Sequence, residues 1–261
     1  MDLIHGDCLE VMKTLDKNSI DLLFCDLPFG CMKKACAWDD ELDLGLFWEQ
    51  VNRICRIDTP MFFCCNTKFG NTLINSNEKN FKFDVVFLKS KSSSFLLAKK
   101  QPMRKHELIY AFYRKQPAIY GENIINLHTR KLLKEYKNNR NESTSPLPLT
   151  VLKEGETNIY GTNYTAKKLY VKQENNSSLY DPPLPTSVLE IKKEGRLHPT
   201  QKPVELMEWF IKYYTKEGDV VLDPTAGSGS TGEACRNLNR KFIGIEKNKD
   251  FFDIMFNRLI E

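Results

Sequence analysis

The segment at residues 218–232 reads GDVVLDPTAGSGSTG, and it decides the fold that we predict for this chain. The apolar run at 220–222 ends in an acid and a proline, and glycines follow at positions 227, 229 and 232. This pattern predicts a buried strand that runs into a tight turn, because glycine adopts backbone conformations that other residues avoid. Residues 230–237 hold no helix breaker beyond Gly232, so we expect a helix directly after the turn. A main-chain loop at a helix N-terminus can approach a ligand closely.

The glycines of this segment form a GxGxxG pattern, and Glu246 follows another apolar run at 242–245. An acid about 20 positions after such glycines is typical of dinucleotide-binding folds. Asp223, however, stands directly before the turn, where a carboxylate would repel pyrophosphate, and no lysine follows Gly232 as in a P-loop. Asp223 suits a cationic ligand such as the ammonium group of a methionine moiety, and Glu246 can accept two ribose hydroxyls. A turn that binds nothing is the alternative, but a strained turn beside two acids is costly without a use.

Together these residues resemble the S-adenosylmethionine loop of methyltransferases. The resemblance implies that S-adenosyl-L-methionine is the cofactor. It assigns the cofactor contacts of this loop to Asp223, Pro224, Thr225, Ala226, Gly227, Ser228, Gly229 and Glu246.

The length and composition favour one α/β domain with an inserted lobe. The chain has 261 residues and a formal net charge of only +4, so its overall charge does not by itself indicate a nucleic-acid partner. It has no N-terminal apolar run and no long hydrophobic span, and we expect a cytoplasmic protein that is neither secreted nor inserted in a membrane. The eight cysteines lie mostly in apolar runs, which predicts reduced, buried thiols. Cys31 and Cys36 lack the CxxC or His pair that would complete a metal site, so no metal is expected.

A second strand end carries the residues that we expect to perform the chemistry. The apolar run at 20–25 ends in DLPFG at 26–30, which alone could be an ordinary turn. With the glycine loop in the same chain, it resembles the DPPY-type catalytic motif of the amino DNA methyltransferases, which methylate exocyclic nitrogens of adenine or cytosine. By this resemblance the catalytic residues are Asp26, Leu27, Pro28 and Phe29. Leu27 replaces the usual second-position proline, Phe29 the usual tyrosine, and Thr225 an aromatic residue common in the cofactor loop.

The expected chemistry starts from an amino group that is a poor nucleophile, because its lone pair is delocalised into the base. Asp26 can accept one N–H, and the carbonyl of Leu27 or Pro28 the other, which aims the lone pair at the sulfonium methyl for direct displacement. The base must leave the duplex, and Phe29 offers a ring on which it can stack. By resemblance, an Asp at the head of the motif implies adenine N6. The alternatives are cytosine N4 methylation, a catalytically silent DNA-binding module of the same fold, and a nicotinamide-dependent oxidoreductase.

Two further segments are candidates for cofactor contacts. Residues 3–7 predict a short strand that ends in Gly-Asp, which puts Asp7 and Cys8 at another strand end, although Asp7 also suits a helix cap. The run HPTQKP at 198–203 resembles the segment that opens the helix before the cofactor loop in this family. Thr200 or Lys202 could meet the methionine carboxylate there, and helix capping is again the alternative.

The excess positive charge of the chain is concentrated at residues 89–115. This segment holds eight basic residues and a single acid, Glu107, which leaves a net charge of +7. Such a segment can follow DNA phosphates, and a solvated basic face is the alternative. The residues assigned to DNA binding are Lys89, Lys91, Lys99, Lys100, Arg104 and Lys105.

Residues 120–195 are rich in Asn, Lys, Ser, Thr and Pro and show little periodicity, which predicts an inserted region. By the resemblance this insertion recognises the target; its DPPL at 181–184 follows no apolar strand and is rejected as a catalytic motif. Residues 1–119 and 196–261 would then form the catalytic and cofactor-binding parts of one domain. A seven-stranded, mostly parallel Rossmann-like sheet is expected, with ligands at its carboxyl edge. Its strands would lie near Leu3, Ile20, Met61, Phe83, Leu108, Val220 and Phe242.

The order of the motifs, with the catalytic motif first and the cofactor loop last, resembles the circularly permuted β class of amino methyltransferases. The resemblance implies double-stranded DNA as the partner, in the cytoplasm of a bacterial or phage-infected host. It also leaves room for a homodimer and for a cognate restriction endonuclease as partners.

Overall fold

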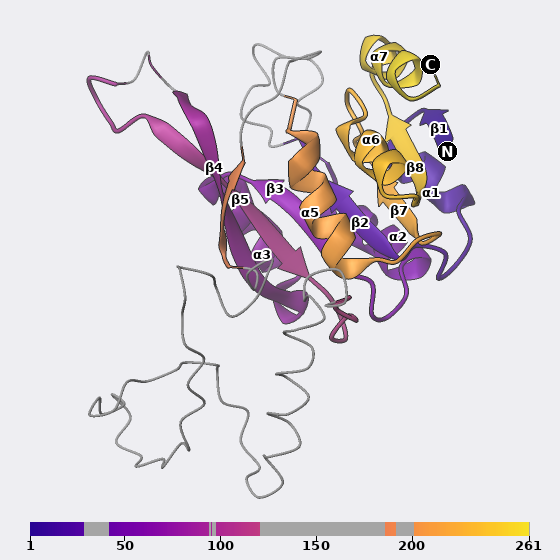
Figure 1. Ribbon diagram of the computed structural model, residues 1–261. Helices are drawn as coiled ribbons and strands as arrows, with labels where there is room; N and C mark the ends of the chain where they lie inside the picture. Colours follow the sequence, from indigo (N-terminus) through magenta and orange to yellow (C-terminus); the bar gives the residue numbers. More distant parts are fainter. Residues whose placement is uncertain (29–41, 94, 96–97, 121–185, 192–200, 261) are drawn as a thin grey trace, which may run out of the picture. The chain divides into compact units, whose positions relative to one another are not determined.

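The computed structural model in Figure 1 describes residues 1–28, 42–93, 95, 98–120, 186–191 and 201–260. The chain divides into two units, of which the first comprises Met1–Asn123 and Pro185–Glu261 and the second Ile124–Leu184. Every described residue belongs to the first unit.

The first unit is built on one eight-stranded sheet with the strand order β1-β8-β7-β2-β3-β5-β4-β6. Five of the seven neighbouring pairs are parallel, and β5 alone runs antiparallel to its two neighbours, β3 and β4. The predicted α/β fold with a mostly parallel sheet is therefore confirmed. The strands are β1 (Asp2–His5), β2 (Leu22–Cys25), β3 (Met61–Cys65), β4 (Phe81–Ser93), β5 (Arg104–Phe112), β6 (Val188–Ile191), β7 (Val220–Asp223) and β8 (Lys241–Glu246).

The sheet contains the seven predicted strands and an eighth, β6, that the sequence did not predict. β6 pairs in parallel with β4 from Val86↔Val188 to Lys89↔Ile191, although it lies inside the range predicted as an insertion, 120–195. Its run of four residues is too short to stand out in a polar, proline-containing context. β6 therefore belongs to the sheet, and the bounds of the insertion stay a prediction.

Two groups of helices cover the two faces of the sheet. Successive side chains of a strand point to opposite faces, and β2 accordingly sends Leu22 and Phe24 into one core and Leu23 and Cys25 into the other. The first core is completed by α5, α6 and α7, and the second by α1, α2 and α3 (Figure 1). The helices are α1 (Cys8–Thr14), α2 (Leu44–Ile54), α3 (Thr67–Ser76), α5 (Val204–Tyr214), α6 (Ser230–Asn237) and α7 (Lys249–Ile260), with a short 3-10 helix at Glu78–Asn80.

The position of the site follows from the order of the central strands. β2 and β7 are parallel neighbours, with Leu22↔Val221 and Leu23↔Leu222 in register, so both strands end at the same edge of the sheet. From β2 the chain continues through α2 to β3 on one side, and from β7 it continues through α6 to β8 on the other side, with the two helices on opposite faces. Such a reversal at adjacent strands opens a crevice beyond their carboxyl ends, where ligands bind in open α/β sheets.

Among the described residues, the helices are too short or too polar to cross a lipid bilayer. The six cysteines that the structure describes, Cys8, Cys25, Cys55, Cys64, Cys65 and Cys235, are free and buried, as the sequence predicted for them.

Candidate active site

The predicted catalytic motif begins where β2 leaves the core. All four residues of β2 are buried, and Asp26 is the first side chain beyond the strand that reaches solvent, with 33% of it exposed. Leu27 turns back into the core, where only 2% of it is exposed, so the residue that replaces the usual proline serves as packing. Pro28 is half-buried, and Phe29 lies outside the described residues. The stacking role of Phe29 and the role of the main-chain carbonyls stay predictions.

Asp223, at the end of β7, holds the turn that follows it. Its Oδ1 accepts a hydrogen bond from the main-chain N–H of Thr225 at 3.1 Å, and its Oδ2 accepts one from the Thr231 hydroxyl at 2.6 Å. Only 5% of the residue is exposed. Burial raises the pKa of Asp223 to about 7, against the lowering effect of the hydrogen bonds from Thr231 and Thr225. At neutral pH this carboxyl therefore lies close to the midpoint of its titration.

Glu246, at the end of β8, holds the same turn from the other side. Its Oε2 accepts the main-chain N–H of Gly227 at 2.9 Å, and its Oε1 accepts that of Asn248 at 2.7 Å. Gly227 and Gly229 have φ angles of 52° and 78°, which glycine adopts without strain. A Cβ atom built on Gly227 would meet no other atom within 4 Å, so the turn presents bare backbone at this point. The loop thus has the open approach that a bound cofactor needs.

The two predicted motifs contact each other through Thr225. Its hydroxyl donates a hydrogen bond to the main-chain carbonyl of Asp26 at 3.2 Å, and its Oγ1 lies 3.5 Å from the Sγ of Cys25. Cys25 is fully buried, and burial raises the pKa of its thiol well above the usual range, so it stays protonated. Thr225, at the position where the family often carries an aromatic residue, therefore joins the cofactor loop to the catalytic loop.

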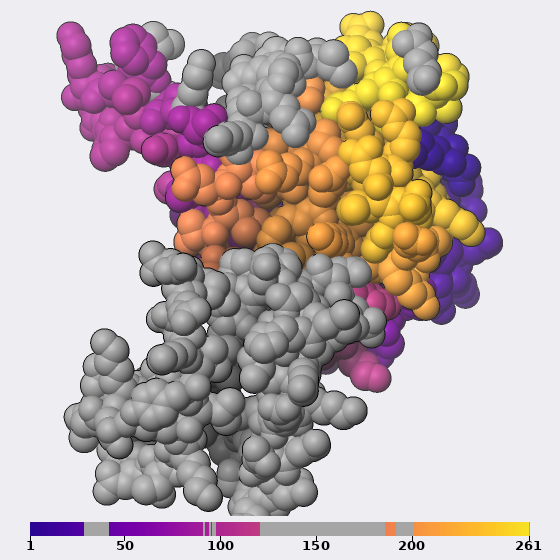
Figure 2. Space-filling view, in the orientation of Figure 1, coloured from indigo at the N-terminus to yellow at the C-terminus, as the bar shows by residue number. Residues whose placement is uncertain are grey.

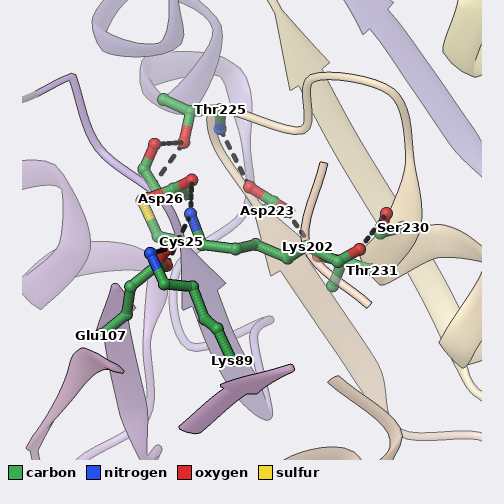
Figure 3. A network of polar contacts seen from close by, with 9 residues as sticks. All are labelled: Cys25, Asp26, Lys89, Glu107, Lys202, Asp223, Thr225, Ser230 and Thr231. Carbon is green, nitrogen blue, oxygen red and sulfur yellow. Dashed lines mark hydrogen bonds and ion pairs between the residues drawn. The ribbon is translucent and has the colours of Figure 1, made fainter. Parts of the chain in front are cut away.

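Lys202 lies directly on Asp26, as Figure 3 shows. Its Nζ donates to Asp26 Oδ2 at 2.5 Å, and a second carboxylate oxygen, Oε2 of Glu107, lies 3.3 Å from the same nitrogen. The main-chain carbonyl of Lys202 accepts a hydrogen bond from the Ser230 hydroxyl at 3.0 Å, which ties this segment to the start of α6. The sequence assigned Lys202 to the methionine carboxylate of the cofactor, and the structure places its ammonium group on the catalytic acid. Thr200, its predicted companion, lies outside the described residues.

Glu107 is a site residue that the sequence reasoning missed. It lies on β5, and its two oxygens each face one lysine, with Oε2 3.3 Å from Lys202 Nζ and Oε1 3.4 Å from Lys89 Nζ. A signal was present, because Glu107 is the single acid in the basic segment at 89–115. Lys89, which was assigned to DNA, is directed into this network, where its side chain is 19% exposed.

The network contains two acids, Asp26 and Glu107, and two bases, Lys89 and Lys202. The ion pairs between them shift the pKa values of Asp26, Glu107 and Lys202. Burial raises the pKa of Asp26, although the Lys202 ammonium opposes this. Burial alone would raise the pKa of Glu107 and lower that of Lys202, but the ion pairs outweigh it in both cases. The pKa of Glu107 is lowered by Lys202 and Lys89, and the pKa of Lys202 is raised chiefly by Asp26. Lys202 is therefore charged at neutral pH.

The other candidate cofactor residues occupy the edge near β1. Asp7 caps α1, since its Oδ1 accepts the main-chain N–H of Leu9 at 2.9 Å, and its Oδ2 lies 3.1 Å from Lys247 Nζ. Cys8 is buried, and burial raises the pKa of its thiol to about 12. The capping interpretation of Asp7 is thus observed, and a contact with the cofactor stays a prediction for both residues.

The remaining basic residues lie in and beside the connection between β4 and β5. Lys99, Lys100 and Lys105 are exposed, Arg104 is half-buried, and the side chain of Lys91 lies outside the described residues. Phe95 lies in the same connection and is 79% exposed. In Figure 2 the magenta ends of the two strands extend away from the other described elements. DNA binding by these residues stays a prediction, and the geometry leaves three of the lysines open to solvent.

Comparison with known proteins gives concordant results. A family model for N6 and N4 methyltransferases, described as DNA methylase, matches residues 20–257. DNA adenine methyltransferase YhdJ of Escherichia coli (strain K12) is 27% identical over 98% of this chain and 82% of its own length. The type II methyltransferase M.HinfI of Haemophilus influenzae is 26% identical over 99% of this chain and 68% of its own length.

Solved structures share the fold. The complex of M1.HpyAVI with SAM matches with a TM-score of 0.60 and 22% identity, over 99% of each chain. The cytosine-N4-specific PvuII DNA methyltransferase matches with a TM-score of 0.63 and 15% identity, over 98% of this chain and 85% of the other. Because the family model spans both strand-end motifs and nearly the whole chain, the protein belongs to the DNA methylase family of N6 and N4 methyltransferases.

Proposed function

We propose that the protein transfers a methyl group from S-adenosyl-L-methionine to the N6 amino group of adenine in double-stranded DNA. The observation that carries the proposal is the contact between the two motifs, in which Thr225 of the glycine loop donates to the main chain of Asp26. A carboxylate that must hold an amino group and a loop that must hold a methyl donor need to lie next to each other. Membership of the DNA methylase family supports the same reaction.

The glycine loop fits S-adenosyl-L-methionine in its chemistry. Gly227 leaves the backbone bare, the carboxylate of Glu246 flanks the turn, where it suits ribose hydroxyls, and Asp223 holds the turn from within. When bound there, the cofactor supplies an electrophilic methyl group on a positively charged sulfur. M1.HpyAVI, which shares this fold, has been solved as a complex with SAM.

Asp26 performs the central step from the protein's side. An exocyclic amino group attacks poorly until its lone pair leaves conjugation with the ring, and a carboxylate that accepts one N–H favours that change. Asp26 is two-thirds buried, and in such a setting a charged acceptor orients a hydrogen-bond donor more strongly than it would in water. Catalysis by positioning and hydrogen bonding of this kind needs no covalent link to the enzyme.

Adenine is the proposed base for two reasons. YhdJ is named a DNA adenine methyltransferase, and it matches this chain over most of both lengths. The motif also begins with Asp26, whereas by family resemblance enzymes that act on cytosine N4 more often carry Ser there. Cytosine N4 is the second candidate, because the PvuII enzyme of the same fold is named cytosine-N4-specific. Mass analysis of nucleosides from DNA methylated by the purified protein distinguishes N6-methyladenine from N4-methylcytosine.

The same proposal extends to the organisation of the chain and its partners. We propose that the insertion predicted at residues 120–195 contains the target-recognition region; within that range, β6 (Val188–Ile191) pairs with β4 in the sheet. The permuted motif order is supported by the adjacency of β2 and β7, whose sequences lie at opposite ends of the chain. A cognate restriction endonuclease and a cytoplasmic site of action are supported by the type II relatives from bacteria. A homodimer stays a prediction of the sequence.

The decisive test is replacement of the proposed catalytic acid. Asp26→Ala should lower the single-turnover rate of methyl transfer by about 100-fold or more, because the acceptor of the amino hydrogen is removed. Binding of S-adenosyl-L-methionine, measured by calorimetry, should stay within a few-fold of the unchanged protein. Asp16→Ala is the matched control, since Asp16 is exposed at the opposite end of β2. Full activity of the Asp26 variant would refute the proposal, as would an inactive unchanged protein with a range of DNA substrates.

A further inference from the structure

We propose that Lys202 is a movable cap on the catalytic carboxylate, and that Glu107 receives its ammonium group when the target amino group takes its place on Asp26. This inference rests on the proposed function, because it concerns the acceptor that the function requires. It assigns Lys202 and Glu107 as positioning residues for the reaction.

The first observation is that a cation already occupies the catalytic carboxylate. Lys202 Nζ occupies Asp26 Oδ2 at 2.5 Å, which is the contact that a charge-assisted hydrogen bond makes. The amino group of the base needs an acceptor on the same side chain, and an ammonium cation on Oδ2 weakens the whole carboxylate as an acceptor, because both oxygens share one delocalised charge. The carboxylate therefore becomes fully available to the base only when the ammonium group moves.

The second observation is that another carboxylate, that of Glu107, lies close to the same ammonium group. Glu107 Oε2 lies 3.3 Å from the same Lys202 nitrogen, so the ammonium group can transfer from one carboxylate to the other by a small side-chain rotation. Glu107 is fixed on β5, where it pairs with Phe87 of β4. Lysine is suited to such a movement, because it carries a compact charge on a flexible stem.

The surroundings of the two carboxylates allow this transfer without loss of charge balance. Lys89 Nζ contacts the other oxygen of Glu107 at 3.4 Å and also donates to Ser93 Oγ at 2.9 Å, so it keeps a partner when Lys202 draws closer to Glu107. The main chain of Lys202 stays in place, because the Ser230 hydroxyl donates to its carbonyl at 3.0 Å and α5 begins two residues later. Movement is thus confined to the lysine side chain.

The chemistry explains why the ammonium group must leave. As the bond from the amino nitrogen to the methyl carbon forms, the bond from that carbon to sulfur breaks and its electron pair goes to sulfur. Positive charge moves from sulfur to nitrogen, directly beside Asp26, and a lysine cation at that point would repel it. The surplus proton on nitrogen then passes to Asp26 and on to water, and Asp26 accepts it more readily without Lys202.

Several groups set the titration of Asp26. Lys202 lowers the pKa of this carboxyl, and Glu107 raises it. Asp223 and the thiols of Cys25, Cys64 and Cys65 also interact electrostatically with Asp26, and burial keeps those thiols neutral. Among the groups that the structure describes around Asp26, Lys202 and Glu107 have opposite effects. A neutral residue in place of Lys202 should raise the pKa of Asp26, and one in place of Glu107 should lower it.

The experiment is a double-mutant cycle in single-turnover methyl transfer across pH. Glu107→Gln keeps the shape but removes the charge that receives the lysine, so we expect the rate to fall by about 10-fold. Lys202→Met removes the cap, and in that background Glu107→Gln should change the rate by less than about 2-fold. Additive effects of the two substitutions would overturn the proposal.

The pH profiles give a readout that a loss of packing would not produce. The rate requires ionised Asp26 on its acidic limb, so Lys202→Met should move that limb to higher pH and Glu107→Gln should move it to lower pH. Glu107→Asp keeps the negative charge and should leave the limb near its original position, even where its shorter side chain lowers the rate. Shifts of the limb in one common direction would contradict the proposal.

The two levels of hypothesis fail differently. If the unchanged protein methylates no DNA, the proposed function is refuted, and this inference is refuted with it. An active protein whose variants behave additively, with normal melting temperatures and normal calorimetric binding of S-adenosyl-L-methionine, would remove this inference alone.

Discussion

The hydroxyl of Thr225 donates a hydrogen bond to the main-chain carbonyl of Asp26 over 3.2 Å, although the two residues are 199 positions apart in the chain. The contact exists because β2 and β7 are parallel neighbours whose carboxyl ends coincide. It couples the loop that should hold the methyl donor to the loop that should hold the base. A substitution of Thr225 that removes this hydrogen bond should therefore lower both the stability of the protein and the rate of methyl transfer.

Thr225→Val tests this coupling, since valine has nearly the shape of threonine but no hydroxyl. We expect a loss of about 1 kcal/mol in the free energy of unfolding, because one hydrogen bond between the loops is removed. The single-turnover rate of methyl transfer should fall as well, because the main chain of Asp26 loses the hydrogen bond that positions it. Urea denaturation and methyl-transfer assays measure the two effects. Thr225→Ser keeps the hydroxyl and should match the unchanged protein in stability and rate. A Thr225→Val variant that also matches the unchanged protein would contradict the proposed coupling of the two loops.

Two glycines of the GxGxxG motif, Gly227 in the turn and Gly232 in α6, should respond in different ways to alanine. A Cβ on Gly232 would come within 2.5 Å of Leu259 Cδ1 and 2.7 Å of Phe242 Cε1, so Gly232→Ala should lower the free energy of unfolding by about 1–3 kcal/mol through overpacking. Gly227→Ala meets no atom within 4 Å, but its φ of 52° costs about 1–2 kcal/mol for alanine. The new methyl group also faces the expected cofactor. Calorimetry should thus show weaker binding for Gly227→Ala and near-normal binding for Gly232→Ala; the reverse order would contradict the loop assignment.

Asp223 should make stability fall as pH rises from about 4 to 7. Its folded-state pKa is about 7 against an ordinary value of 3.8, because burial disfavours the charged form. The folded protein then binds this proton more tightly than the unfolded chain, so the contribution is complete below the ordinary pKa and lost as pH passes through the folded value. The loss is up to about 4 kcal/mol.

Asp223→Asn removes this titration while keeping the size of the side chain. The Thr231 hydroxyl can rotate from donating to accepting, so the hydrogen bond at 2.6 Å need not be lost. Relative to the unchanged protein, the variant should gain unfolding free energy between pH 4 and 7 and no more above that range. Chemical denaturation at several pH values checks this, and parallel stability curves for the two proteins would exclude the assignment.

Glu246 should matter for both the turn and the cofactor. It accepts the main-chain N–H groups of Gly227 and Asn248 with different oxygens, at 2.9 and 2.7 Å, and a glutamine can replace only one of these acceptors. Glu246→Gln should therefore cost about 1–3 kcal/mol of stability for the unpaired N–H group. Affinity for S-adenosyl-L-methionine should fall by about 10-fold, since one acceptor for a ribose hydroxyl is also lost. Glu190→Gln, at an exposed position on β6, is the control and should change neither quantity.

The exposed lysines between β4 and β5 should contribute to DNA binding through phosphates. Lys99→Gln combined with Lys100→Gln should reduce the slope of log affinity against log salt concentration by about 2, because about 0.9 counterion is released for each phosphate contact. Lys17→Gln with Lys216→Gln is matched in charge, and these exposed lysines precede β2 and β7, at the edge of the sheet away from the site. Fluorescence anisotropy over a salt series provides the slopes, and equal slopes for the two pairs would exclude a phosphate role for the connection.

Local patterns were sufficient for most of the architecture. Apolar runs bounded by polar or glycine-rich turns predicted the seven strands, and the acid at the end of β2 and the glycine loop after β7 identified the family, because strand periodicity and turn chemistry are properties of neighbouring residues. The eighth strand escaped prediction, since β6 is a four-residue run that becomes a strand only by pairing with β4.

The sequence by itself thus determined the class of fold, the two motifs and the type of reaction, all of which depend on residues close together in the chain. Only the tertiary structure decided that the ammonium group of Lys202 lies on Asp26, and that Glu107 and Lys89 complete the network. These four residues come from separate segments of the chain, which the order of strands in the sheet brings together. Ion pairs of this kind depend on that order, and a pattern of neighbouring residues carries no information about it.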